Sequence, residues 1–292
     1  MEMLQTRLVV LAVMLGALGC GAKRQVPQET LWREAEEAFQ DGAYQLAVER
    51  YKALLDEDPF DPRAEEAELK IAYSHYLAHR YAEAISGFGD FERMHPTSSQ
   101  LAFVEYHLGM SYMSQTSTSD RDRQPHVDAL NYFRNLIDRF PGSPWAERAH
   151  LRLRECQEAL AAHEADVAMF YLHRGNLRAA EARLGGLLAE YPDTDATART
   201  LYAFAEEYGK RDEDEGTTLT LATLARHHPD DPLADEARRR LGDSLEELGD
   251  QDPLPLLQAR IASVRSRADR QEVRPTVSAY PNTPGGAGPG RY

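Results

Sequence analysis

Apolar residues recur along most of the chain at intervals of three and four positions, the spacing that gathers them on one face of an α-helix. The clearest example is the stretch 129–147, ALNYFRNLIDRFPGSPWAE, whose apolar pattern ends at Phe140. Pro141 cannot continue a helix, because proline lacks an amide donor and its ring clashes with the preceding turn. Ser143 and Pro144 are typical of a helix cap and a first helical position. The pattern therefore predicts one helix that ends before Pro141 and another that begins at Pro144.

The same helix-turn-helix pattern occurs five times, and each copy has one proline at its turn: Pro59, Pro96, Pro141, Pro192 and Pro229. Twelve positions before each proline stands a residue small enough for two helices to approach closely, namely Ala47, Ala84, Ala129, Ala180 and Thr217. Eight positions before each proline stands a large apolar residue: Tyr51, Phe88, Phe133, Leu184 and Leu221. The first two prolines and the last two are each 37 residues apart, close to the period of about 34 residues in tetratricopeptide repeats (TPRs). We therefore predict an all-α fold, a TPR solenoid of five repeats.

The two longer spacings between prolines predict an inserted loop and an inserted helix. Residues 115–124, QTSTSDRDRQ, are too polar for a core and are expected to form a surface loop. Residues 145–174 contain neither glycine nor proline, so we expect a long connecting helix there. C-terminal capping helices follow the last repeat, one of them expected near 232–248. The predicted divisions are a lipoprotein signal peptide (1–19), a lipidated tether (20–29), an N-terminal TPR group (30–142), a long helix with a C-terminal TPR group (143–252), an amphipathic helix (253–271) and a disordered tail (272–292).

The N-terminus has the pattern of a secretory signal. Arg7 precedes an apolar run over 8–18 that is too short to cross a bilayer. The run ends in ALGC at 17–20, which resembles a bacterial lipobox, where signal peptidase II cleaves before the cysteine and the thiol receives diacylglycerol. We expect Cys20 to be the mature N-terminus and to carry acyl chains such as palmitate, which anchor a protein to a membrane. The alternative is an ordinary signal peptide with an unrelated cysteine.

Charge and cysteine content narrow the class of protein. The net charge of −15 disfavours nucleic acid as a partner, because binding to phosphates needs a basic surface. An anionic bilayer is disfavoured for the same reason, so membrane attachment is expected through the N-terminal lipid. The second cysteine, Cys156, lies on a predicted helical face with Leu153 and Leu160. We expect it to be a small buried residue.

Candidate catalytic and metal-binding residues do not combine into a site. Residues 242–245 spell GDSL, but that esterase motif needs its serine directly after a strand, whereas these residues fall in a predicted helix. His75 and His79 are four positions apart on one predicted helix without an evident third ligand, so we expect packing or surface roles for them. GGAGPG at 285–290 lacks the strand and helix of a phosphate-binding loop. We therefore predict a non-enzyme with no cofactor and no metal.

Aromatic residues are concentrated on the first helices of the repeats, the helices that line the concave side of a TPR array. Tyr73, Tyr76 and Tyr106 are our candidates for a groove that binds an extended peptide. Tyrosine suits this task because it combines apolar area with a polar tip. Some of these aromatic residues are also expected to belong to the core.

Three segments resemble the BamD family of outer-membrane protein assembly lipoproteins. They are DRDRQPHVDALNYFRNLIDRFPGSPWAE (120–147), HEADVAMFYLHRGNLRAAEAR (163–183) and EYPDTDATARTL (190–201). The resemblance covers about residues 20–228, with the segments in the family order, and the lipobox also fits. It implies a TPR lipoprotein anchored to the outer membrane and facing the periplasm. The alternative is another periplasmic TPR lipoprotein that acts as a cell-envelope adaptor, and the second segment disfavours it because general TPR consensus does not require that sequence.

The same resemblance implies partners and one contact residue. Members of the family bind the membrane-proximal POTRA domain of the barrel protein BamA, belong to the BAM complex with other lipoproteins, and engage unfolded outer-membrane β-barrel proteins for folding and insertion. In the family, an arginine shortly before the YPDT turn pairs with an acidic residue of BamA, and the matching residue here is Arg183. The alternative role for Arg183 is an ion pair within its own helix, with Glu181 or Glu190.

Overall fold

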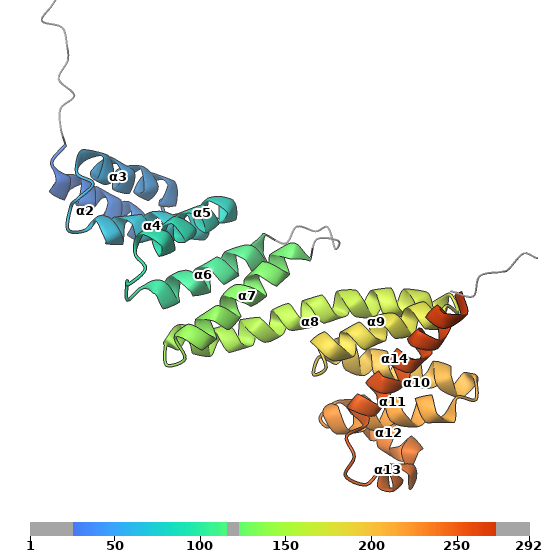
Figure 1. Ribbon diagram of the computed structural model, residues 1–292. Coiled ribbons are helices and arrows are strands. Elements are labelled where there is room, and N and C mark those ends of the chain that lie inside the picture. Colours follow the sequence, from blue (N-terminus) through green and yellow to red (C-terminus); the bar gives the residue numbers. More distant parts are fainter. Residues whose placement is uncertain (1–25, 116–122, 273–292) are drawn as a thin grey trace, which may run out of the picture. The chain divides into compact units, whose positions relative to one another are not determined.

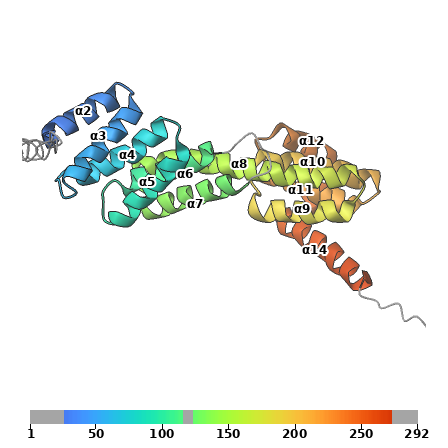
Figure 2. The same ribbon diagram turned by 90° about the horizontal axis from the view of Figure 1, so that it is seen from above.

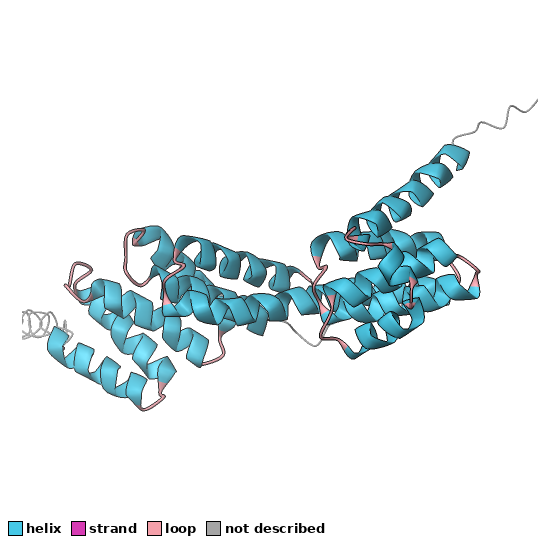
Figure 3. Cartoon of the chain, turned by 90° about the horizontal axis from the view of Figure 1, so that it is seen from below, coloured by secondary structure: helices cyan, strands magenta, loops and turns pink. Residues whose placement is uncertain are grey.

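The computed structural model describes residues 26–115 and 123–272, and in these residues helices and turns occur without any strand (Figures 1 and 3). The helices of these residues are α2 (Gln28–Gln40), α3 (Tyr44–Glu57), α4 (Ala64–Leu77), α5 (Tyr81–Met94), α6 (Leu101–Ser114), α7 (Gln124–Arg139), α8 (Pro144–His173), α9 (Leu177–Glu190), α10 (Asp195–Lys210), α11 (Asp214–His227), α12 (Pro232–Leu241), α13 (Ser244–Glu247) and α14 (Pro253–Glu272). The all-α repeat fold predicted from the sequence is confirmed. Cys20 and the predicted signal peptide lie outside the described residues, as do residues 273–292 of the predicted tail.

The five prolines stand at helix ends, as the sequence predicts. α3, α5, α7, α9 and α11 each end two residues before the proline of their repeat. The cause is steric, because proline pushes the residue before it out of the helical region. After Pro141, the hydroxyl of Ser143 accepts a hydrogen bond from the amide of Ala146 at 3.0 Å, and α8 begins at Pro144. The predicted cap and the predicted first helical residue are both confirmed.

The repeat alignment also predicted which residues are buried. The large apolar position is at most 2% exposed in all five repeats: Tyr51, Phe88, Phe133, Leu184 and Leu221. The small position is fully buried in four repeats: Ala47, Ala84, Ala129 and Ala180. Thr217 is only half-buried, and its neighbour Gly216 takes the crowded place, since a β-carbon on Gly216 would lie 3.0 Å from the guanidinium of Arg260. Thr217 is still the fourth residue of its helix, as Ala47, Ala84 and Ala180 are, so the alignment holds and only the burial differs in the last repeat.

The turn between the two helices of a repeat uses a residue in the left-handed region. Gly42 and Gly175 have φ of +75° and +73°, while His79 and Asp212 adopt φ of +58° and +56°. All four stand 17 positions before the proline of their repeat. Glycine adopts this conformation without a steric penalty, whereas other residues do so at a cost of roughly 1–2 kcal/mol. Because α4 ends before His79, the prediction that it shares a helix with His75 is wrong.

The chain divides into two compact units between Leu153 and Arg154, inside the 30-residue helix α8. In unit 1, which ends at Leu153, the helices α2 to α7 pack against one another in sequence order (Figures 1 and 2). Their buried side chains form one cluster around Tyr51 and another around Phe88. Each helix pair thus buries its apolar face on its neighbours, as a repeat array requires.

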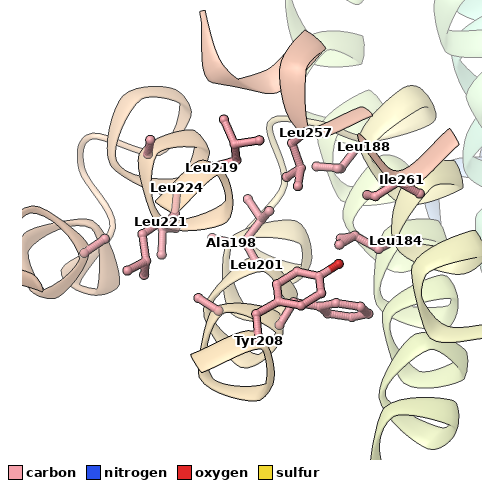
Figure 4. Packing of buried hydrophobic residues seen from close by; sticks show 14 of the residues in the cluster. Leu184, Leu188, Ala198, Leu201, Tyr208, Leu219, Leu221, Leu224, Leu257 and Ile261 are labelled. Carbon is pink, nitrogen blue, oxygen red and sulfur yellow. The ribbon is translucent and has the colours of Figure 1, made fainter. Parts of the chain in front are cut away.

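Unit 2, which begins at Arg154, has a core that includes residues from beyond the last repeat. α14 packs against both α9 and α11. Leu257 and Ile261 of α14 are 0% and 5% exposed, and Figure 4 shows them beside Leu188 and Leu184 of α9. Cys156 of α8 is fully buried, as predicted. The C-terminal helix is therefore an integral part of this unit.

The helix expected near 232–248 is interrupted. α12 ends at Leu241, Gly242 adopts a φ of +49°, and the short helix α13 begins at Ser244. A β-carbon on Gly242 would meet nothing within 4 Å, so the glycine serves the turn through its conformational freedom. The prediction that the GDSL residues lie within one helix is therefore wrong.

Candidate functional site

The three tyrosines selected from the sequence belong to one group of rings in unit 1. We call this group the aromatic cluster, and its members are Tyr73, Tyr76, Phe103, Tyr106, His107 and Trp145. The rings of Tyr73 and Tyr76, both on α4, stack with a centroid distance of 6.1 Å and an interplanar angle of 10°. The ring of Tyr106, on α6, lies 5.1 Å from that of Trp145, the second residue of α8. Three helices therefore bring these rings together.

His107 lies at the centre of the aromatic cluster. Its ring centroid is 4.0 Å from that of Phe103, 4.9 Å from Tyr73, 5.2 Å from Tyr76 and 5.3 Å from Trp145. Its Nδ1 lies 2.8 Å from the backbone oxygen of Phe103, so Nδ1 carries the proton and donates it to that carbonyl. Burial lowers the pKa of His107 to about 4. The imidazole is therefore neutral at neutral pH.

The buried His107 predicts that unit 1 is sensitive to acid. A histidine whose pKa falls from 6.5 to about 4 on folding stabilises the fold fully above pH 6.5, and this contribution is lost as the pH falls toward 4. Each pH unit removes about 1.4 kcal/mol, so about 2 kcal/mol is lost by pH 5. Between pH 7.5 and pH 5, the loss of unfolding free energy measured with denaturant should be about 2 kcal/mol smaller in His107→Phe than in the wild type, because other buried histidines, such as His75, titrate in both proteins. Equal losses in the two proteins would contradict the assignment.

Members of the aromatic cluster differ in the surface that they offer to a ligand. Tyr106 is 9% exposed and mainly fills the core, whereas Tyr73 and Tyr76 are half-buried. Burial raises the pKa of both half-buried phenols, so they keep their hydroxyl protons. The guanidinium of Arg148 lies 4.7 Å over the ring of Trp145 and adds a cation to the cluster. Ring faces with polar tips of this kind suit a peptide that carries aromatic side chains.

Sequence reasoning missed His107, Phe103 and Trp145. Phe103 and His107 are four positions apart on α6, the spacing that makes side chains neighbours on a helix. This spacing can be read from the sequence, but it does not distinguish residues of a binding cluster from ordinary core residues of a helix. Trp145 follows directly after Pro144, and the sequence pattern of this segment indicated only that a helix begins there.

Arg183 lies on α9 in unit 2 at the edge of the buried face, directly before the fully buried Leu184. Its side chain is 48% exposed, and its Nη1 donates a hydrogen bond to Oε2 of Glu164 on α8 at 3.2 Å. The alternative of a pair with Glu181 is wrong, because Glu181 is 4% exposed and accepts a hydrogen bond from the hydroxyl of Tyr208 at 2.7 Å. The guanidinium of Arg183 is thus oriented by α8 and keeps a large exposed surface.

The turn that follows α9, with the sequence YPDT at 191–194, is held in place by α8. The carboxylate of Glu158 accepts hydrogen bonds from the amides of Asp195 and Ala196 at 2.9 Å each. The hydroxyl of Thr194 accepts a further one from the amide of Thr197 at 3.3 Å, as a helix cap does. A carboxylate is favoured here because the first amides of α10 lack partners within the helix. α8 therefore fixes both this turn and Arg183.

The candidates for catalysis and metal binding have structural roles. His75 is buried, and Nδ1 of His79 lies 2.6 Å from the hydroxyl of Tyr81. Across residues 26–115 and 123–272, no group of three or more His, Cys, Asp or Glu side chains could hold a metal ion. Ser244 begins a short helix, and the described residues before it contain no strand to form an esterase turn. Within the same ranges, no helix is both long enough and apolar enough to cross a membrane.

Comparison with known proteins gives consistent matches over most of the chain. A family model described as YfiO, an outer membrane lipoprotein, matches residues 24–220. The outer membrane protein assembly factor BamD of Vibrio cholerae is 32% identical over 193 residues, which cover 63% of this chain and 80% of that protein. BamD of Haemophilus influenzae is 29% identical over 220 residues, covering 70% and 83%, and BamD of Rickettsia prowazekii is 28% identical over 226 residues, covering 75% and 89%.

The stacked helix pairs define a helical-repeat scaffold. The matched residues 24–220 contain the aromatic cluster and Arg183. The chain belongs to the BamD family of outer membrane protein assembly factors. The family resemblance seen in the sequence is confirmed. Because these relatives are assembly factors, the prediction of a non-enzyme is confirmed as well.

Proposed function

We propose that this chain is a lipid-anchored scaffold of the outer-membrane β-barrel assembly machinery, which faces the periplasm and binds BamA and unfolded β-barrel proteins for folding and insertion. The observation that carries the proposal is the family match over residues 24–220, which includes both candidate binding surfaces. Its relatives are named outer membrane protein assembly factors. Side chains on packed helices suit a scaffold, because rigid elements hold binding residues in place.

Capture of partners from membranes dissolved in a mild detergent tests this function. With the full-length chain carrying an affinity tag, mass spectrometry should identify BamA and the other BAM lipoproteins among the most enriched proteins. Enrichment of peptidoglycan-associated proteins without BamA would instead support a cell-envelope adaptor and would overturn the proposal.

The proposed anchor is lipid on Cys20. Replacing Cys20 with alanine should move the protein from the detergent phase to the aqueous phase in a phase-separation assay, because acyl chains contribute roughly 0.8 kcal/mol per buried methylene. Cys156→Ala is the matched control, since this thiol is buried in α8 and its loss should leave the partitioning unchanged. Equal partitioning of the wild type and Cys20→Ala would show that the anchor lies elsewhere.

The proposed substrate contact is the aromatic cluster. A fluorescent peptide from the C-terminus of a β-barrel protein should bind roughly 2- to 10-fold more weakly to Tyr73→Ala and to Tyr76→Ala, since each aromatic contact contributes about 0.5–1.5 kcal/mol. Tyr106→Phe is the informative change at the third position, because truncating this nearly buried ring would disturb the core. Tyr202→Ala, on α10 in unit 2, is the control. A scrambled peptide that binds as well as the native one would contradict this contact.

A further inference from the structure

Unit 1 contains a second candidate binding site, apart from the aromatic cluster. A cavity of about 350 Å³ is lined by side chains of α5, α6 and α7: Glu92, Glu105, Tyr112, Asp128, Asn131, Tyr132 and Asn135. The α7 residues at 128, 131, 132 and 135 follow helical spacing and therefore share one face of that helix. Glu105 and Tyr112 are seven positions apart on α6, so they also lie on one face. The site is thus built from regular helix faces.

The wall of this cavity includes a carboxylate oxygen without a hydrogen-bond partner. Glu105 is 0% exposed, and its Oε1 pairs with Nη1 of Arg139. The same Nη1 also contacts Oε1 of Glu92 at 3.1 Å. Oε2 of Glu105 is buried and makes no hydrogen bond within the described residues. A buried polar oxygen without a partner is costly, and native proteins rarely leave one unless a ligand, an ion or water completes the site.

The other lining groups identify the chemistry that would complete the site. The lining carries three carboxylates, those of Glu92, Glu105 and Asp128. The first two contact Arg139, whose side chain is 48% exposed, and Oδ1 of Asp128 accepts a hydrogen bond from Gln124 at 2.9 Å. The amide side chains of Asn131 and Asn135 add further acceptor oxygens. The rings of Tyr112 and Tyr132 stack at 5.5 Å with an interplanar angle of 17°, and aromatic faces attract organic cations. Within the described residues no cluster suited to a metal ion exists, so the site favours an organic cation.

We propose that this cavity binds the cationic side chain of a partner polypeptide, a lysine or an arginine, with Glu105 and Asp128 as its acceptors. The ammonium or guanidinium would supply the missing partner of Oε2 in Glu105, while the aliphatic stem would lie along the tyrosine rings. Burial raises the pKa of Glu105 to about 7, which shows that Arg139 alone does not offset the desolvation of this carboxylate. The proposal does not depend on the role in barrel assembly.

Isotope labelling of the asparagines, followed by NMR of their side-chain amides, tests the proposed cation site directly in the full-length chain. Asn131 and Asn135 line the cavity, whereas Asn176 caps α9 in unit 2 and serves as the internal control. The probes are the capped tripeptide Gly-Lys-Gly and its uncharged isostere with norleucine in place of lysine. At roughly millimolar concentration, the lysine peptide should shift the NMR signals of the two cavity amides and leave that of Asn176 in place. The norleucine peptide should shift neither.

Two variants and a matched control complete the experiment. Glu105→Gln and Asp128→Asn should each weaken binding of the lysine peptide at least about fivefold, because each removes an acceptor charge. Asp138→Asn, an exposed change of the same charge on α7, should leave binding unchanged. Because Asp128 is partly exposed, Asp128→Asn tests the site without altering the buried carboxylate of Glu105. Equal responses to the lysine and norleucine peptides, no response to either, or unchanged binding in Asp128→Asn would overturn the proposal.

Discussion

Replacement of Arg260 by alanine should lower the free energy of unfolding of unit 2 by about 3–5 kcal/mol. Arg260 lies on α14 and is 13% exposed in its side chain; its guanidinium contacts Glu181 at 3.3 Å and also contacts Glu213. It lies 4.5 Å over the ring of Tyr208 as well. Glu181 is only 4% exposed. Without Arg260 it would still accept the hydrogen bond from the hydroxyl of Tyr208, but it would have lost this cation. A buried carboxylate without a cation is strongly destabilising, whereas the intact pair roughly offsets its own desolvation.

Hydrogen exchange of α9, α10 and α11, followed by mass spectrometry on the full chain, measures this effect within unit 2. The control is Arg239→Ala on α12, whose ion pair with Glu236 is exposed and screened by solvent, so its loss should change the stability little. The double variant Arg260→Met, Glu181→Gln should recover much of the loss, since it removes both charges together. If Arg260→Ala exchanged no faster than Arg239→Ala, α14 would not be held by this ion pair.

Arg183→Glu should release BamA, the partner named in the proposed function, because Arg183 matches the family arginine that pairs with an acidic residue of BamA. An ion pair between a guanidinium and a carboxylate across an interface is geometrically selective, and truncating one side costs roughly 2–5 kcal/mol of binding, or at least about 30-fold in affinity. Arg183 is accessible for such a contact, because its side chain is 48% exposed although it forms an ion pair with Glu164. The substitution also places a carboxylate at position 183 beside the carboxylate of Glu164. Because the Glu164 side chain is 14% exposed, the two like charges are only partly screened by solvent, and some loss of stability is expected as well.

Retention of BamA on the tagged chain measures the loss, and two controls separate binding from folding. Glu164→Gln removes the partner of Arg183 within the chain but keeps the arginine, so it should still capture BamA. Arg239→Glu, at a position that is 69% exposed on α12, reverses a charge elsewhere in unit 2 and should have no effect. Exchanging the partner's acidic residue for lysine should restore capture by Arg183→Glu. Full retention of BamA by Arg183→Glu would show that the contact lies elsewhere.

Helix boundaries in the repeats could be predicted because two local rules act on the same residues. Helical periodicity marks the buried face, and the proline two residues past each helix end blocks its continuation. Tyr51 and Phe133 occupy the same position of the alignment, and both are fully buried. Neither rule needs knowledge of distant contacts, so one sequence was sufficient.

Features that depend on distant contacts could not be predicted in this way. Arg260 and Glu181 are separated by 79 positions, and an amphipathic pattern over α14 does not reveal which helices it packs against. Gly109 and Gly242 each stand 13 positions after the proline of their repeat. A β-carbon on Gly109 would lie 2.6 Å from the ring of Phe133, whereas Gly242 forms a turn. Equal spacing from the proline does not reveal these different reasons for a glycine.

The candidate site was predicted in part. Sequence reasoning selected Tyr73 and Tyr76 without His107, because the ring that joins them comes from α6 and a histidine in a helix resembles any core residue. Arg183 was found through a family motif, and its partner Glu164 was missed because the pair joins two helices. Local pairs within a helix follow from spacing, but pairs between helices need the packing itself.

The central claim is that this chain assists the assembly of outer-membrane β-barrel proteins. Its most direct test is to deplete the protein in the bacterium that encodes it and to measure the folded fraction of β-barrel proteins in the outer membrane, using the resistance of folded barrels to unheated detergent in gel electrophoresis. The account predicts that folded barrels decline while unfolded barrel proteins accumulate in the periplasm, and that wild-type protein restores the folded fraction more fully than Arg183→Glu. An unchanged folded fraction after complete depletion would contradict it.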